Sequence, residues 1–262
     1  TSNSDYLNSC CSIVESDSFD LAIRFNASII ISRLIRKFAL SWPISIFQNL
    51  DTWFLSLISK DNYLNSDMND LSKNKMLAKQ IGSTYGCLIY GYFHEDKKEF
   101  VNFWPKIEPI INYSKSFQIA GFNFLIGLFE FFWKHPNHFD NDNDTLPNVA
   151  LKCIVLLQQI EKNPELRDLN LIESIFELLD SILLIFRGYY EDVKNFSISC
   201  YQEKLLEIYQ SPGLCRSFYT FVFSNFNEVN LRSLFLKLLY HIVSIPNYTN
   251  KDTLIAVYKY AF

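Results

Sequence analysis

Glycine and proline are scarce in this chain of 262 residues, which contains 7 glycines and 8 prolines. Sandwiches and barrels of this size need many more turn residues, so a β-rich fold is disfavoured. None of the six cysteines forms a Cys-x-x-Cys pair, and most lie in apolar stretches, where cysteine acts as a small buried hydrophobe. We therefore expect reduced thiols and a cytoplasmic or nuclear location.

An excess of basic residues is also missing. The chain carries 24 Lys and Arg against 28 Asp and Glu, which gives a formal net charge of −4. A protein that binds nucleic acid non-specifically usually has a basic balance or a dense basic stripe. Nucleic acid is therefore the less favoured partner, and it stays open only through a local basic patch.

Sequence patterns of catalysis are absent too. No Gly-x-Ser-x-Gly elbow occurs, and the chain has four histidines. His241 lies in an amphipathic segment, where we expect a structural role rather than that of a base. Glu173 and Glu177 are one helical turn apart, which predicts a solvated helix face rather than an acid–base pair. We expect no catalytic residue and no enzymatic activity.

The best metal candidate is the segment 135–144, in which two histidines precede three aspartates at alternate positions. A calcium loop that began at Asp140 would need Gly at its sixth position and Glu at its twelfth. Those positions hold Thr145 and Leu151, and no further zinc ligands lie nearby in the sequence. We expect a solvated acidic loop, with no metal and no cofactor.

The apolar run 117–133 is at the lower length limit of a membrane span. It contains Gln118, Asn123 and Glu130, whose side chains would be costly in hydrocarbon. We therefore expect this run to be a buried central helix, and the chain to make no membrane contact.

What the chain does contain, from end to end, is apolar residues at i, i+3, i+4 and i+7, the spacing of amphipathic helices. This periodicity predicts an all-α fold. The helices are expected near 5–16, 18–41, 43–59, 71–93, shorter pieces of 95–113, 115–134, 148–162, 167–188, 191–210, 214–227, 229–245 and 250–261.

The segment 18–41 is predicted to have Ser18 as its N-cap and to bury one apolar stripe. That stripe consists of Phe19, Ile23, Ala27, Ile30, Leu34 and Phe38. The opposite side of the same helix carries Arg24, Ser28, Ser32, Arg36 and Lys37.

Two later segments show the same order. In 167–188 the predicted buried stripe is Ile172, Ile175, Phe176, Leu179, Leu183 and Phe186. Its predicted solvent side holds Glu173, Glu177, Asp180 and Arg187. In 229–245 the predicted buried stripe is Leu231, Leu234, Phe235, Leu238 and Ile242.

Gly82 and Gly86 lie four residues apart in the predicted helix 71–93. No Lys-Ser/Thr follows them and no strand precedes them, so a phosphate-binding loop is disfavoured. Small residues at this spacing let another backbone approach closely, which predicts a tight helix crossing or a break in the helix.

Alternate strong helices begin near residues 18, 71, 115, 167 and 214, in steps of about 44 to 53 residues, close to the period of helical-hairpin repeats. The dipeptides Trp42-Pro43 and Trp104-Pro105 are alike. In architecture the chain resembles HEAT and armadillo repeat proteins, although the regular Pro, Asp and Arg positions of those repeats are absent.

The resemblance implies a right-handed α-solenoid of stacked antiparallel helix pairs, with 1–262 forming a single α-helical repeat domain and 135–147 marking a sub-boundary. The terminal helices are apolar, without the polar faces that cap a solenoid, so we expect either a segment of a larger protein or a partner that covers the ends. The resemblance also implies a scaffold for protein–protein interaction, as in nuclear transport receptors or chromosome-associated complexes.

Basic residues supply the candidate partner-binding sites. They could bind an acidic peptide, a phosphorylated protein or, as the alternative function, nucleic acid. The two groups are Arg33, Arg36 and Lys37, and Lys73, Lys75 and Lys79.

Overall fold

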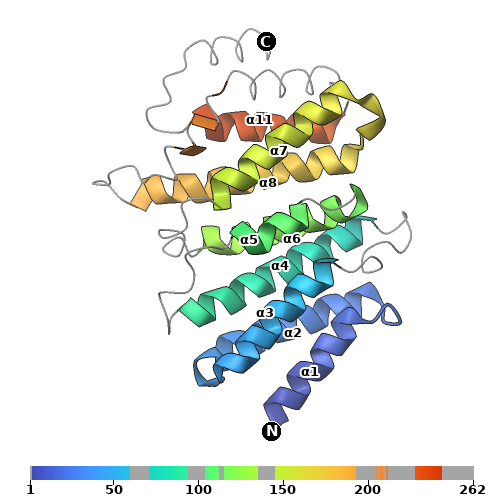
Figure 1. The fold of residues 1–262 in the computed structure, drawn as a ribbon, viewed down its shortest axis with the longest axis vertical. Helices are drawn as coiled ribbons and strands as arrows, with labels where there is room; N and C mark the ends of the chain where they lie inside the picture. Colours follow the sequence, from blue (N-terminus) through green and yellow to red (C-terminus); the bar gives the residue numbers. More distant parts are fainter. Residues whose placement is uncertain are drawn as a thin grey trace. The chain divides into compact units, whose positions relative to one another are not determined.

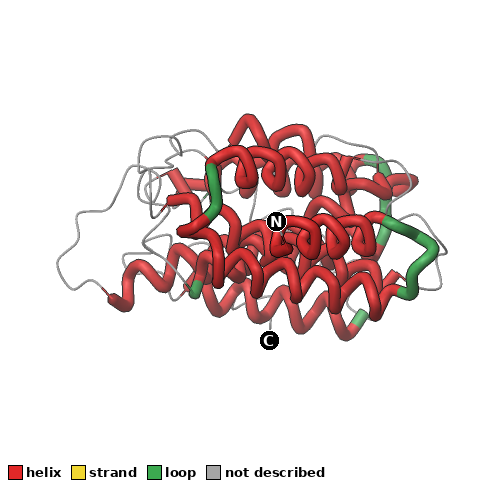
Figure 2. The backbone as a smooth tube through the Cα atoms, turned by 90° about the horizontal axis from the view of Figure 1, so that it is seen from below, coloured by secondary structure: helices red, strands yellow, loops and turns green. Residues whose placement is uncertain are grey.

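The computed structural model describes residues 2–59, 71–93, 104–111, 115–134, 145–192, 204–205, 207–208, 211 and 228–243. These residues form helices joined by turns and loops, with no β-strand among them (Figure 2). The all-α prediction is confirmed for this part of the chain. Contacts divide the chain into two compact units, Thr1–His138 and Phe139–Phe262, and the division falls inside the predicted loop 135–147.

The first unit follows the predicted helix order closely. The predicted helices 5–16, 43–59 and 115–134 differ from the structure by a few residues at their ends. The described helices are α1 (Ser2–Glu15), α2 (Leu21–Phe38), the 3-10 turn η1 (Ala39–Ser41), α3 (Ile44–Ser59), α4 (Leu71–Phe93), α5 (Trp104–Ile111) and α6 (Lys115–Trp133).

The beginning of α2 differs from the prediction. Asp20, rather than Ser18, is the N-cap, because its carboxylate accepts a hydrogen bond from the backbone N–H of Ala22 at 2.7 Å. Ser18 lies outside the helix, where its hydroxyl is 2.6 Å from that of Ser16. The two serines close the turn between α1 and α2, so the helix starts three residues later than expected.

Three long helices of this unit lie side by side, with α4 between α2 and α6 (Figure 1). Ser28 pairs with Thr84, and Ser32 pairs with Cys87, so residues closer to the C-terminus of α2 contact residues closer to the C-terminus of α4. The two helices therefore run parallel. The intervening helix α3 returns the chain antiparallel to both.

Aromatic contacts give the direction of α6. The ring of Tyr85 lies 5.6 Å from that of Phe124, and the ring of Tyr90 lies 6.1 Å from that of Phe131. The contact residue nearer the C-terminus of α4 again meets the one nearer the C-terminus of α6, so these two helices also run parallel. Helices α2, α4 and α6 thus form a layer of parallel helices in chain order.

The predicted close approach at the glycines is confirmed. A Cβ atom added at Gly82 would collide with the backbone oxygen of Phe124 on α6. Reciprocally, a Cβ at Gly127 would collide with the backbone oxygen of Lys79 on α4. Each helix therefore needs a residue without a side chain at the crossing point.

The apolar helix α6 is buried as predicted. From Ile119 to Phe129 every side chain is buried, including that of Asn123, which donates to the backbone oxygen of Ile119 at 2.8 Å. In the described residues, no helix has the length and apolarity that a membrane span requires.

The buried face of α2 is not the predicted one. Phe19 is 41% exposed and Ile23 is 48% exposed, although both were expected in the core. The buried side of the helix instead contains Arg24, Ser28 and Ser32, which periodicity assigned to the solvent face. Ala27, Ile31 and Ile35 lie on the same buried side. The small serines let α4 approach closely and find hydroxyl and thiol partners there.

The second unit is described over three helices and one 3-10 turn. They are α7 (Thr145–Lys162), η4 (Pro164–Leu166), α8 (Leu169–Asp192) and α11 (Val229–Val243). Residues 145–147 belong to the first turn of α7, not to the loop that the sequence predicts. Helix α8 packs against both α7 and α11. The predicted helices 214–227 and 250–261 lie outside the described residues, and the predicted helix 191–210 lies largely outside them.

Burial in the second unit agrees with the prediction at most positions. The described members of the α8 stripe are buried, as are Leu231, Phe235 and Leu238 of α11, whereas Leu234 of the predicted α11 stripe is only half-buried. Asp180, expected on the solvent side, is only 4% exposed. Its burial is explained by two partners on α11, described below.

Candidate interaction surface

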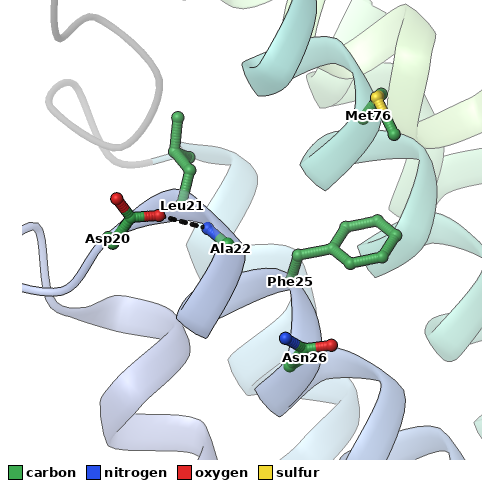
Figure 3. Close-up of a pocket in the computed structure, with 6 residues that line it drawn as sticks. All are labelled: Asp20, Leu21, Ala22, Phe25, Asn26 and Met76. Carbon is green, nitrogen blue, oxygen red and sulfur yellow. Dashed lines mark hydrogen bonds between the residues drawn. The ribbon is translucent and has the colours of Figure 1, made fainter.

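A groove opens at the surface of the first unit between the first turns of α2 and the N-terminal half of α4 (Figure 3). Its volume is about 330 Å³. The lining is largely apolar, and Phe25 extends from α2 toward the helix that carries Met76 (Figure 3). The lining residues are Asp20, Leu21, Ala22, Phe25, Asn26 and Met76.

The groove exists because of how α2 begins and which way it faces. Asp20 holds the first turn by accepting from Ala22, which keeps that turn helical at the surface. With Ser28 and Ser32 buried against α4, Phe25 is half-buried at the edge of the helix contact, and Met76 of α4 is 59% exposed.

Chemically the groove suits apolar contact. Among the lining residues that the structure describes, Asp20 is the one with a titratable side chain, and its carboxylate caps a helix. An apolar lining with few polar groups fits a hydrophobic side chain of a partner better than it fits a reacting substrate.

The first predicted basic group lies at the other end of α2. Arg33, Arg36 and Lys37 are all exposed. The guanidinium of Arg36 crosses α4, because its Nε donates to Sγ of Cys87 at 3.4 Å and its centre lies 6.0 Å from the ring centroid of Phe131 on α6. No carboxylate of the described residues forms an ion pair with these three cations.

The second predicted basic group lies elsewhere along the helix pair. Lys75 and Lys79 are half-buried in the N-terminal half of α4, and Lys73 is in its first turn. The Ser28–Thr84 register aligns Arg33 with a point about ten residues beyond Lys79, or roughly 15 Å along the helix axis. The structure brings α2 and α4 together but separates the two basic groups along their length.

A buried tyrosine and a half-buried carboxylate join three helices of the first unit. The hydroxyl of Tyr85 donates to Oδ1 of Asp51 at 2.6 Å, and Nζ of Lys106 lies 2.8 Å from Oδ2. Burial, and secondly the charge of Asp51, raises the pKa of Tyr85 well above its ordinary value. The arrangement keeps the phenol protonated, which suits a structural hydrogen bond.

A carboxylate that is buried, that of Asp180, joins α8 to α11. Nζ of Lys237 lies 2.5 Å from Oδ2 of Asp180, and Nδ1 of His241 lies 2.7 Å from Oδ1. The His241 contact lacks hydrogen-bond geometry, and it becomes an ion pair when the imidazole is protonated. His241 is 8% exposed, so this cluster ties two helices together inside the unit.

In the described part of the chain, no three His, Cys, Asp or Glu side chains are grouped so that they could hold a metal ion. The predicted acidic loop 135–144 lies outside that part. Cys10, Cys11, Cys87 and Cys153 are free thiols.

No protein-family model, curated protein or solved structure matches this chain. The groove therefore has to be interpreted from its own chemistry.

Sequence reasoning missed the groove because its lining combines residues of α2 with Met76 of α4, which are far apart in the sequence. One signal could have indicated it. The side of the helix opposite the predicted stripe contains two serines four residues apart, Ser28 and Ser32, a spacing that suits close helix contact as well as solvent exposure.

Proposed function

We propose that this chain is a non-catalytic helical scaffold that binds a protein or peptide partner. We further propose that it is built as a right-handed α-solenoid of stacked antiparallel helix pairs. The parallel layer of α2, α4 and α6 supports this architecture, because stacked hairpins place every second helix in one layer with a common direction.

The apolar groove between α2 and α4 carries the functional proposal. Phe25 and Met76 line it, and Met76 is 59% exposed. Exposed apolar side chains that gather at one place on a folded surface mark interaction sites more often than scattered ones do. A partner helix or extended segment would bury these side chains, as in helix-in-groove recognition.

Site-directed photo-crosslinking would test this proposal. A benzophenone amino acid is placed at Ala22, inside the groove, and in a second preparation at Ser233, an exposed site on α11. Each preparation is irradiated in an extract of the native cells, and crosslinked proteins are identified by mass spectrometry. We expect a protein that is captured from Ala22, not from Ser233.

Competition gives the control. Excess unlabelled wild-type protein should suppress the crosslink, whereas a variant with Ala22→Glu and Met76→Glu should not. Identical capture from both positions, or undiminished competition by the variant, would refute the groove as a docking site. A crosslink to nucleic acid that disappears after nuclease treatment would instead favour the nucleic-acid alternative.

A further inference from the structure

We propose that the occupant of the groove is an acidic–apolar linear segment of a partner protein. Its apolar residues would fill the groove, and its carboxylates would pair with Arg33 and Lys37 farther along α2. This inference rests on the proposed docking function and specifies the chemistry of the partner.

The geometry of α2 places both features on one outward side. Ala22, Asn26, Ile29, Arg33 and Arg36 recur at i, i+4, i+7, i+11 and i+14, the spacing of one helical face. All five are exposed or half-buried. Beside the groove this face carries Ala22, Asn26 and Ile29, and toward the C-terminal end of α2 it carries Arg33 and Arg36.

Charge decides which partner fits this face. Among the described residues no carboxylate neutralises Arg33 or Lys37, whereas Arg24 near the start of α2 is buried and already pairs with Asp17 at 3.0 Å. Arg36 is held across α4 by Cys87, which keeps its cationic group near the same face. Complementary charge at the rim of an apolar site favours an acidic partner and repels a basic one.

The spacing also limits the occupant. About ten residues of α2 separate the centre of the groove from the Arg33–Lys37 group, which is roughly 15 Å along the helix axis. A partner helix of about ten residues covers this length, and so does an extended segment of about five residues. The structure therefore indicates a short linear motif rather than a broad folded interface.

A random peptide library of about 16 residues, displayed on phage, is the probe. It is selected on the full wild-type chain and counter-selected on the Ala22→Glu, Met76→Glu variant. We expect surviving peptides to combine at least one large apolar residue with an excess of Asp and Glu toward one end.

The charge is then tested directly with one surviving peptide, labelled with fluorescein and measured by anisotropy. Reversal of charge in the Arg33→Glu, Lys37→Glu variant should weaken binding by about tenfold or more. Replacing the acidic residues of the peptide with Lys should restore binding to that variant. Raising NaCl from about 0.05 to about 0.5 M should weaken the wild-type complex.

Matched variants show whether a loss of binding comes from the position of the changed charges, from the change in net charge or from misfolding. Lys134→Glu with Lys162→Glu changes the net charge by the same amount at exposed sites that do not line the groove, and it should keep the wild-type affinity. Leu151→Glu with Leu236→Glu adds carboxylates at exposed apolar sites of the second unit and should also leave binding unchanged. Circular dichroism verifies the helicity of every variant.

The outcomes distinguish this inference from the function on which it rests. Groove-dependent peptides without an acidic excess, or equal binding by the Arg33→Glu, Lys37→Glu variant, overturn the acidic occupant and leave the docking function intact. If no peptide survives counter-selection, both proposals fail. Tighter binding of a labelled single-stranded DNA, abolished by the same charge reversal, would overturn the acidic peptide in favour of nucleic acid.

Discussion

The hydroxyl oxygens of Ser28 on α2 and Thr84 on α4 lie 3.1 Å apart inside the core of the first unit. Thr84 also approaches the backbone oxygen of Ser28 at 3.3 Å and donates to that of Gln80 at 2.8 Å. This small polar contact sets how closely the two helices approach. It also decides which side of α2 remains on the surface.

Ser28→Leu should therefore destabilise the protein although it makes α2 more apolar. Ser28 is 1% exposed, and the added side chain would have to push α4 away, at a cost of about 1–3 kcal/mol. Ser28→Ala should cost less, about 0.5–1.5 kcal/mol, because Thr84 keeps its bond to Gln80. Urea unfolding measures both. Equal or greater stability of Ser28→Leu would contradict the close packing.

Gly82→Ala should cost more than Gly86→Ala. A Cβ at position 82 meets the backbone of Phe124, which can move only with the whole helix, whereas a Cβ at position 86 meets the side chain of Phe131 at 2.8 Å. In an unobstructed helix each change would stabilise by about 1 kcal/mol. We expect a loss of about 2 kcal/mol or more at position 82 and a smaller change at position 86, measured by urea unfolding. Equal effects would argue against the tight crossing.

Tyr85→Phe should reveal a pH dependence. The folded protein raises the pKa of Tyr85 well above its ordinary value of 10, first through burial and then through Asp51, so this residue contributes stability that is fully present below about pH 10. That stability is lost as pH rises toward the folded pKa, because only the unfolded phenol has released its proton.

The measurement compares wild type with Tyr85→Phe between about pH 8 and about pH 11, so that effects of other titrating groups cancel. At the lower pH the wild type should be more stable by about 1–2 kcal/mol, from the hydrogen bond to Asp51. This advantage should shrink above about pH 10. A constant or growing difference would show that the phenol of Tyr85 is not held protonated.

Asp180→Asn should loosen α11. The carboxylate is buried and contacts both Lys237 and His241, so we expect a loss of about 1.5–3 kcal/mol. Lys237→Ala should cost less than about 1 kcal/mol, because the lysine is 54% exposed. Hydrogen exchange should increase in α11 for Asp180→Asn and stay unchanged in α4. Unchanged protection of α11 would mean that apolar contacts alone hold it.

Cys153, which is buried, and Cys11, which is half-buried, should resist alkylation in the folded state. Burial raises the pKa of Cys153 far above its ordinary value, and burial followed by the charges of Cys10 and Glu15 raises the pKa of Cys11 to about 12. Thiolates are the reactive form, so iodoacetamide at about pH 8 should modify both residues much more slowly than in urea. Peptide mapping measures the rates. Labelling of native Cys153 at the unfolded rate would contradict its burial.

Helix positions were predictable because they depend on local periodicity. The ranges of α3, α4 and α6 were anticipated closely, and so was the burial of α6, since its apolar residues cover every side. The pair Gly82 and Gly86 indicated a close approach before any partner was known. The continuous repeat architecture of the whole chain stays a prediction.

The candidate site was predictable only in part. The cations at Arg33, Arg36 and Lys37 were recognised as exposed charge, but the groove beside them was not. Periodicity assigned Ser28 and Ser32 to the solvent face, because their partners, Thr84 and Cys87, are more than 50 residues away in the sequence. Asp180 was misassigned in the same way, because its partners lie on α11.

Hydrophobic spacing alone was thus enough for this chain to specify helices, their approximate ranges and a buried middle, because each depends on neighbours within a few turns. The choice of inward face on α2 was made by contact with α4, since close backbone approach and paired hydroxyl groups outweighed the burial of Phe19 and Ile23. That choice left apolar side chains and unneutralised cations together at the surface, where the proposed partner would bind.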